Sequence, residues 1–289
     1  MVVRLPLKEE ILVRFQVPQQ FLKNLSYTVK MYNLKEFLIF GLKQAQASIF
    51  AGLFFIILFL SNHIPLFGLA RYDFIFIAAI LIQILLYVFK LETKDEIKVI
   101  FLFHIIGFVL ELYKTSPMVG SWSYPEDAFF KIATVPLYSG FMYAAVGSYM
   151  SQAYKIFKMK FENYNHYFGS VILCFLIYLN FFTNHFIYDF RIFLIIAVFI
   201  FFKKTKIYYI PYKKVRMMYM NISFVLVAFF IWIAENISTY LGAWKYPDQI
   251  HEWSLVSTQK ISSWFLMVII SAIIVAYLKH YKETVLKKS

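Results

Sequence analysis

Long apolar runs, separated by short polar segments rich in lysine, form the main pattern of the chain. The runs cover residues 44–61, 73–90, 98–113, 130–151, 168–183, 185–202, 217–235 and 260–278. Most of them approach the ~20 residues that a helix needs to cross a hydrocarbon core ~30 Å thick. The pattern therefore predicts an all-α, polytopic helical membrane protein with about eight transmembrane helices.

Composition supports a membrane class. Hydrophobic residues make up 61% of the 289 residues and charged residues only 16%, which is outside the range of ordinary soluble domains. The single cysteine, Cys174, lies within an apolar run, so we expect no disulfide framework and no thiolate metal cluster. The first apolar run is too far from the start of the chain to be a cleavable signal peptide.

The lysines and arginines are distributed unevenly between the polar segments. They precede the first run and follow the second, fourth, sixth and eighth runs, whereas the intervening segments hold few. The positive-inside rule then predicts a multi-pass protein of the cell membrane with both termini in the cytoplasm. This rule also accounts for the net charge of +13. We therefore expect membrane lipids, and not nucleic acid, as partners.

Two signatures occur twice. Ser61-Asn62-His63 reappears as Thr183-Asn184-His185, and Gly120-Ser121-Trp122-Ser123-Tyr124-Pro125 reappears as Gly242-Ala243-Trp244-Lys245-Tyr246-Pro247; both copies lie 122 residues further on. Glu111 with Thr115 is repeated as Glu235 with Thr239, 124 residues further on. Such spacing indicates a duplicated unit.

The duplication divides the chain into three parts. A basic cytoplasmic or interfacial segment covers residues 1–43, a first four-helix repeat covers 44–160, and a second repeat with a basic tail covers 161–289. Four helices per copy is an even number, so the two repeats are expected to be parallel and related by a pseudo-twofold axis along the membrane normal.

This topology brings the repeated motifs to the outer membrane face. We expect the two histidines and the two glutamates of the repeats to face one central cavity. The candidate catalytic residues are Glu111, Glu235, His185 and Asp189. The candidate substrate-binding residues are His63, Thr115, Trp122, Tyr124, Arg191, Thr239, Trp244 and Tyr246.

The glutamates carry the chemical interest of this site. A helix that begins near Lys98 places Glu111 ~20 Å along its axis, still inside the hydrocarbon core. A carboxylate there costs ~2.5–3.5 kcal/mol and usually faces a partner or a wet cavity. Two nearby carboxylates do not easily both ionise, so one can hold a proton for acid–base chemistry.

A structural interpretation of the same residues stays open. Trp and Tyr are enriched at membrane interfaces, Tyr-Pro makes a rigid turn, and each glutamate can simply tie two helices together. The sequence contains no His-Glu-x-x-His run or histidine-rich box, so no metal site is assigned, and any cofactor is unknown.

The segment from Glu111 to Tyr149, Asn184-His185 through Arg191, and Trp232 to Trp264 resemble an uncharacterised bacterial membrane family known as domain of unknown function 817. The resemblance implies an integral membrane protein and supplies no activity. A fainter similarity, carried by Trp122-Ser123-Tyr124 and Val135-Pro136-Leu137, is to membrane carotenoid cyclases and hydratases. Those proteins have paired acidic residues after the proline, where this chain has Leu137-Tyr138-Ser139.

Two functions remain open. The first is a membrane-embedded enzyme or binding pocket for a lipid or isoprenoid substrate, with outer-leaflet carboxylates. The second is a transporter of a small solute or ion, with the same carboxylates coupling proton movement. A carrier needs a polar path to both faces, whereas the polar residues gather towards one face. This asymmetry favours the binding or catalytic pocket.

Overall fold

The computed structural model describes the backbone of residues 19–164 and 167–286, and the side chains of residues 33–164 and 168–276. Residues 1–18 of the predicted N-terminal segment lie outside the described residues. In the described part, the chain forms nine α-helices, two β-sheets of two and three strands, and one short 3-10 helix. The protein is therefore mostly helical, as the apolar pattern predicts.

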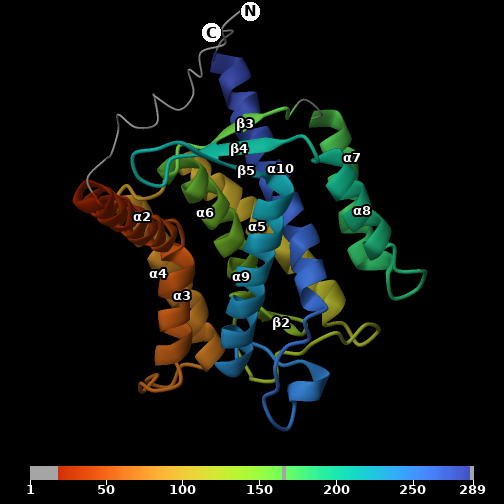
Figure 1. The fold of residues 1–289 in the computed structure, drawn as a ribbon. Coiled ribbons are helices and arrows are strands. Elements are labelled where there is room, and N and C mark those ends of the chain that lie inside the picture. Colours follow the sequence, from red (N-terminus) through yellow and green to blue (C-terminus); the bar gives the residue numbers. More distant parts are fainter. Residues whose placement is uncertain (1–18, 165–166, 287–289) are drawn as a thin grey trace, which may run out of the picture.

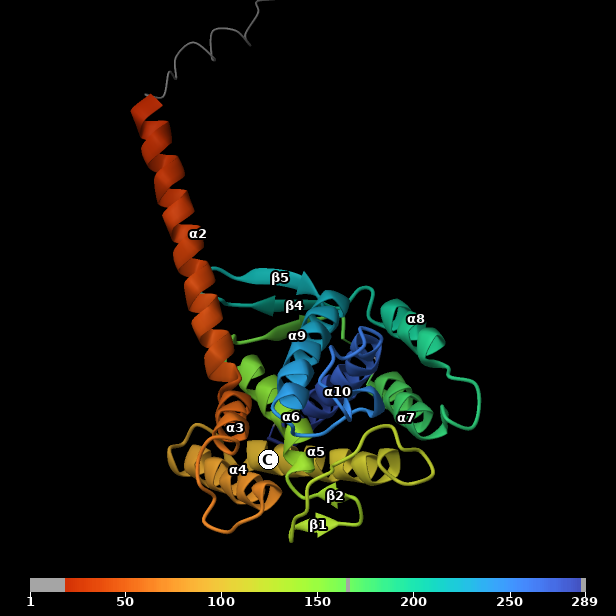
Figure 2. The same cartoon turned by 90° about the horizontal axis from the view of Figure 1, so that it is seen from below.

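Each of the eight predicted segments contains a helix. The helices are α3 (Ile49–Leu60), α4 (Arg71–Val88), α5 (Lys94–Lys114), α6 (Ser139–Ile156), α7 (Tyr167–Thr183), α8 (Arg191–Phe201), α9 (Met220–Tyr240) and α10 (Lys260–Leu286). A further helix, α2 (Gln19–Ala47), precedes them and extends away from the rest of the molecule (Figure 2).

Few of these helices are long and apolar enough to cross a membrane alone. Within the described residues, α4 and α9 meet that requirement. Residues 33–47 of α2 and helix α3, which meet at a bend of 69°, add a third candidate if they form one broken span. By helix length and composition, the described residues therefore do not support the predicted eight spans. Helix α8, for example, has 11 residues and is ~16 Å long, about half of a hydrocarbon core.

Two predicted segments begin later than the apolar pattern indicates. In the segment predicted at 130–151, β1 (Lys131–Ile132) and β2 (Val135–Pro136) form a hairpin, and α6 starts only at Ser139. Pro136 restricts the residue before it to extended conformations, which excludes a helix there. The segment predicted at 185–202 becomes helical only at Arg191, because Asn180 Oδ1 accepts from the backbone N–H of Phe190 and Asp189 Oδ1 accepts from that of Arg191, which fixes the turn into α8.

The sequence analysis missed a three-stranded antiparallel sheet in the lysine-rich segments. Its strands are β3 (Lys160–Glu162), β4 (Lys206–Tyr209) and β5 (Arg216–Tyr219), in the order β3-β4-β5. The sheet lies at one end of the helices and the β1–β2 hairpin lies at the other (Figure 1). We call these ends the sheet end and the hairpin end.

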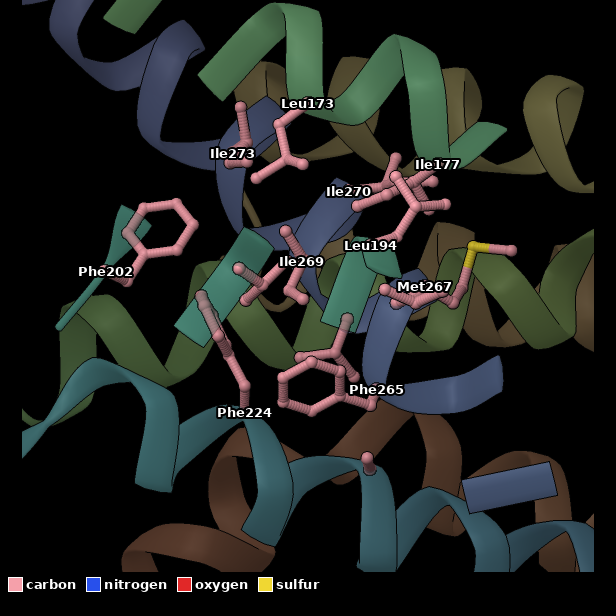
Figure 3. Close-up of a cluster of buried hydrophobic side chains, with 14 of the residues drawn as sticks. Leu173, Ile177, Leu194, Phe202, Phe224, Phe265, Met267, Ile269, Ile270 and Ile273 are labelled. Atoms are coloured by element: carbon pink, nitrogen blue, oxygen red, sulfur yellow. The ribbon is translucent and has the colours of Figure 1, made fainter. Parts of the chain in front are cut away.

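Buried apolar side chains of α7, α8, α9 and α10 form the largest core cluster. Leu173, Ile177, Leu194, Phe224, Phe265 and Ile269 are among its members (Figure 3). Many apolar side chains on the outward faces of the helices are exposed, including Phe37, Leu42, Leu81, Val88, Phe101, Phe175, Ile192, Phe193 and Phe230. Such faces are compatible with a membrane protein, in which lipid covers them.

Helices α5 and α6 approach closely at glycines. A methyl group at Gly147 would overlap the ring of Phe103, and one at Gly107 would overlap the ring of Tyr143. Small residues allow helix backbones to approach, and van der Waals packing then holds the helices together. Gly52 on α3, in contrast, has no atom within 4 Å of the position of an added methyl group.

We therefore expect Gly147→Ala to lower the free energy of unfolding by about 1–3 kcal/mol through overpacking. Gly52→Ala is the matched control in another helix, and we expect it to be neutral or to stabilise by about 0.4–1 kcal/mol. Thermal unfolding of the full chain in detergent measures both changes. Equal effects of the two substitutions would contradict the close α5–α6 contact.

Candidate functional site

Glu111 lies on the last turn of α5 and accepts three hydrogen bonds. Its Oε2 accepts from Trp122 Nε1 at 2.7 Å and from the Tyr124 hydroxyl at 2.7 Å. Its Oε1 accepts from the hydroxyl of Tyr143, on α6, at 2.7 Å. The glutamate is only 2% exposed. The carboxylate therefore ties the loop that follows α5 to α6.

Glu235, on α9, has a matching environment. Its Oε1 accepts from the Tyr246 hydroxyl at 2.6 Å, and its Oε2 accepts from Trp264 Nε1, on α10, at 2.8 Å. This glutamate is 4% exposed. In each half, a glutamate thus holds the tyrosine of the following Trp-x-Tyr-Pro loop and an aromatic side chain of the next helix.

We call residues 120–125 and 242–247 the motif loops, and the structure brings them together at the hairpin end. The backbones of Ser123 and Lys245 exchange two hydrogen bonds, of 2.9 and 3.0 Å, as an isolated antiparallel bridge. The rings of Trp122 and Tyr246 meet edge to face, with centroids 6.1 Å apart. The bridge joins the residues that occupy the same position in the two motifs.

The remaining motif residues, Trp244, Thr115 and Thr239, pack against or bond to other groups of the protein. Trp244 is buried in a cluster with Tyr124 and Tyr246. Thr115 donates to the backbone carbonyl of Glu111 at 2.9 Å, and not to its carboxylate. Thr239 likewise donates to the Asn236 carbonyl, and its hydroxyl accepts from Trp253.

Lys260 begins α10 beside the motif loops, and sequence analysis did not single it out. Its Nζ lies 4.3 Å from the ring centroid of Tyr246 and 5.4 Å from that of Trp122. The ammonium therefore faces two aromatic rings, an arrangement that stabilises a partly desolvated cation. Burial of Tyr124 and the negative charge of Glu111 raise the pKa of the Tyr124 hydroxyl well above its ordinary value, so it remains a donor.

The two histidines of the repeated motif, His63 and His185, contact different groups. His63 follows the end of α3; its ring stacks on that of Phe59 with centroids 4.2 Å apart, and its Nδ1 lies 2.7 Å from the Phe59 carbonyl oxygen. His185 Nε2 instead lies 2.9 Å from Lys114 Nζ and 3.5 Å from Ser121 Oγ.

Asp189 and Arg191 form an ion pair, with Arg191 Nη2 3.1 Å from Asp189 Oδ2. Asp189 and His185 both precede α8, so they do not share a helix face. Asp189 accepts instead from Asn180 at 3.1 Å and from the backbone of Arg191 at 3.0 Å.

Arg71, which the sequence analysis does not single out, begins α4 as Arg191 begins α8. Arg71 Nη1 donates to the Gly242 carbonyl at 3.0 Å, and Asn62 donates to the Leu241 carbonyl at 3.0 Å. Both therefore cap the carbonyl end of α9, a function that sequence spacing does not reveal.

An open groove lies between α3 and α9, separate from the glutamates. It has a volume of about 550 Å³ and is lined by Phe55, Ile56, Phe59, Asn236, Ile237, Tyr240, Leu241 and Trp253. Both polar ends of the Asn236 amide already bond within the protein, to Val256 and Trp232. The wall of the groove is therefore apolar. Within the described residues, no group of three or more His, Cys, Asp or Glu side chains is arranged to hold a metal ion.

The fold and this site define a mostly helical protein with candidate membrane spans, in which two repeated aromatic loops are held by buried glutamates. Residues 36–272 match the family described as "Protein of unknown function (DUF817)", and the chain belongs to this family. The Uncharacterized protein YoaT of Bacillus subtilis (strain 168) is 48% identical over 253 residues, which cover 88% of this chain and 95% of YoaT. No solved structure matches. The fainter similarity to carotenoid cyclases is not shown by these matches.

The hydrogen bonds of Glu111 lead to a stability prediction. In Glu111→Gln, the amide nitrogen cannot accept a hydrogen bond, so at least one buried donor loses its partner. We expect the free energy of unfolding to fall by about 1–3 kcal/mol. Glu252→Gln, at an exposed position of the same end, is the control and should leave stability unchanged. Similar thermal unfolding of both variants in detergent would sink the structural role of Glu111.

Proposed function

We propose that this chain is an integral membrane protein that binds a lipid or isoprenoid by its hydrocarbon part, in the groove between α3 and α9. The groove is the observation that carries this proposal. Its volume of about 550 Å³ and its apolar lining suit a hydrocarbon chain. For a ligand that enters the groove from water, each CH₂ group it buries contributes ~0.8 kcal/mol to the free energy of binding. Such a groove therefore binds mainly by hydrophobic contact.

The mouth of the groove offers polar contacts for the rest of such a ligand. His63 stacks on Phe59, which lines the groove, and its ring is exposed. The ring of Trp253, another lining residue, packs edge to face on Tyr240 with centroids 5.4 Å apart. Histidine and interfacial aromatic side chains suit the boundary between hydrocarbon and headgroup.

In this proposal, eight membrane-embedded helices form two parallel four-helix repeats, α3–α6 and α7–α10, with both termini in the cytoplasm. The exposed apolar faces of α4, α5, α7, α8 and α9 support contact with lipid. The lysine-rich strands lie at the sheet end and the motif loops at the hairpin end. The matched surroundings of Glu111 and Glu235 support the duplication.

The glutamates serve this function by holding the motif loops in place. A role as proton donor would require Glu111 to exchange one of its three hydrogen bonds for a bond to substrate. The geometry therefore favours binding over acid–base catalysis. The catalytic assignment of Glu111, Glu235, His185 and Asp189 stays a prediction.

Filling the groove tests the binding site. Ile237→Trp places a large ring in the groove, and we expect it to displace at least two methylene groups of a ligand, which at ~0.8 kcal/mol each weakens binding about tenfold. Ile222→Trp, an exposed position on the same helix outside the groove, is the matched control. Photo-crosslinking with a diazirine-bearing polyprenyl or acyl probe measures occupancy. Equal crosslinking of both variants would contradict the groove as the binding site.

The topology is tested by accessibility of single cysteines. The chain has one cysteine, so Cys174→Ser gives a clean background. Glu252→Cys, at the hairpin end, should react in intact cells with a membrane-impermeant maleimide. Lys203→Cys, beside the sheet, should react only after the membrane is permeabilised. The reverse pattern would refute the proposed orientation, and labelling of both in intact cells would refute the membrane-spanning arrangement.

A further inference from the structure

Lys114 is a buried cation without an acidic partner of its own. The residue is 6% exposed. Its Nζ bonds to the amide oxygen of Asn184 at 3.1 Å and to Nε2 of His185 at 2.9 Å. In the part of the chain that the structure describes, Lys114 forms no ion pair. Burying an ammonium costs free energy unless an opposite charge compensates it.

Further basic groups from two other helices lie near enough to Lys114 for their charges to act on it. The positive charges of Arg191 and Lys260 both act on Lys114, and all three act on His185. These residues come from the end of α5, the loop before α8, the start of α8 and the start of α10. We call Lys114, His185, Arg191 and Lys260 the basic cluster.

The carboxylates near the basic cluster are already engaged. Asp189 acts on Lys114 but forms its ion pair with Arg191, at 3.1 Å. Glu235 and Glu111 act on Lys260 from the side of the motif loops, where their oxygens accept from Trp and Tyr side chains. Lys260 and Arg191 thus have acidic neighbours, whereas Lys114 has no carboxylate in ion-pair distance among the described residues.

One buried donor without an acceptor, Arg191 Nε, and one weakly bonded hydroxyl, that of Ser121, accompany this charge. Arg191 Nε is buried and has no hydrogen-bond partner, although its Nη1 donates to Ser262 Oγ at 3.2 Å. The hydroxyl of Ser121 lies 3.5 Å from His185 Nε2. A tetrahedral oxyanion accepts several hydrogen bonds at once, and charge-assisted bonds from Lys and Arg to phosphate are among the strongest in proteins.

We propose that the basic cluster binds a phosphate-type oxyanion, either free phosphate or the phosphate of a lipid headgroup. Lys114 and Lys260 supply ammonium charge, Arg191 supplies its free Nε–H, and Ser121 supplies a hydroxyl. The site is distinct from the groove between α3 and α9, with which it shares no lining residue. It therefore does not depend on hydrocarbon binding in that groove.

His185 couples this site to protons. Burial, followed by the positive charges of Lys114 and Lys260, lowers the pKa of His185 below its ordinary value, while Asp189 acts in the opposite direction and Arg191 in the same one. A bound anion opposes these positive charges and raises the pKa again. Binding should therefore take up a proton and become tighter as pH falls through the pKa of the anion-bound state.

Calorimetric titration of the full chain in detergent with inorganic phosphate tests the free-anion arm. Lipid retention from nanodiscs containing phosphatidic acid or only phosphatidylcholine, measured by native mass spectrometry, tests the headgroup arm. We expect saturable binding in one of these arms, and Lys114→Gln should weaken it about tenfold or more, because a charge-assisted hydrogen bond is lost. Lys203→Gln, at an exposed lysine of the sheet end, removes the same charge and should leave binding unchanged.

The controls make each outcome decisive. If Lys114→Gln does not fold, Lys260→Gln and Ser121→Ala at the same site should weaken binding while Lys203→Gln does not. Saturable binding of phosphate alone assigns a soluble ligand, and selective retention of phosphatidic acid assigns a lipid. No saturable binding in either arm, or equal weakening by Lys203→Gln, would overturn the proposal. If Ile237→Trp loses groove crosslinking but still binds phosphate, the phosphate site is independent of the proposed hydrocarbon groove, as we expect.

Discussion

Two buried carboxylates organise the hairpin end of this protein. Glu111 and Glu235 are each almost inaccessible, and each accepts hydrogen bonds from a motif-loop tyrosine and from a side chain of the next helix. A buried carboxylate without donors would be strongly destabilising. The donors come from aromatic residues, which fill space while presenting one polar group each. These bonds hold the first loop through Trp122 and Tyr124 and the second through Tyr246, in positions where Ser123 and Lys245 also pair.

Much of this arrangement follows from the sequence because the repeated residues are local signals. The apolar runs locate a helix in each of eight places, and the repeated motifs identify the loops and the two glutamates. Tyr143 and Trp264 escape such reasoning, since each lies on an aromatic-rich helix where nothing distinguishes it from a packing residue. They stand 121 residues apart, close to the repeat distance, and this spacing is the signal that could have revealed them.

The three-stranded sheet and the helix bounds depend on tertiary contacts, which a local sequence pattern does not predict. Lysine-rich segments indicate cytoplasmic loops, and the alternation in Lys206–Tyr209 is too short to predict a strand until β3 and β5 supply its neighbours. The helices are also shorter than some of the apolar runs, because a run such as 185–202 contains the loop that Asn180 and Asp189 hold by hydrogen bonds. Hydrophobicity alone does not distinguish apolar loop residues from helical ones.

The corresponding asparagine and arginine residues of the two motif copies make different contacts. In the first half, Asn62 and Arg71 both bind carbonyl groups at the end of α9. In the second half, Asn184 accepts from Lys114, and Arg191 pairs with Asp189 and Ser262. The amide and guanidinium that close a helix end in one half are thus available for charged side chains in the other. Because Glu111 and Glu235 hold both motif loops, these asparagine and arginine side chains can make different contacts without changing the loops: Asn62 and Arg71 cap α9, whereas Asn184 and Arg191 contact charged side chains.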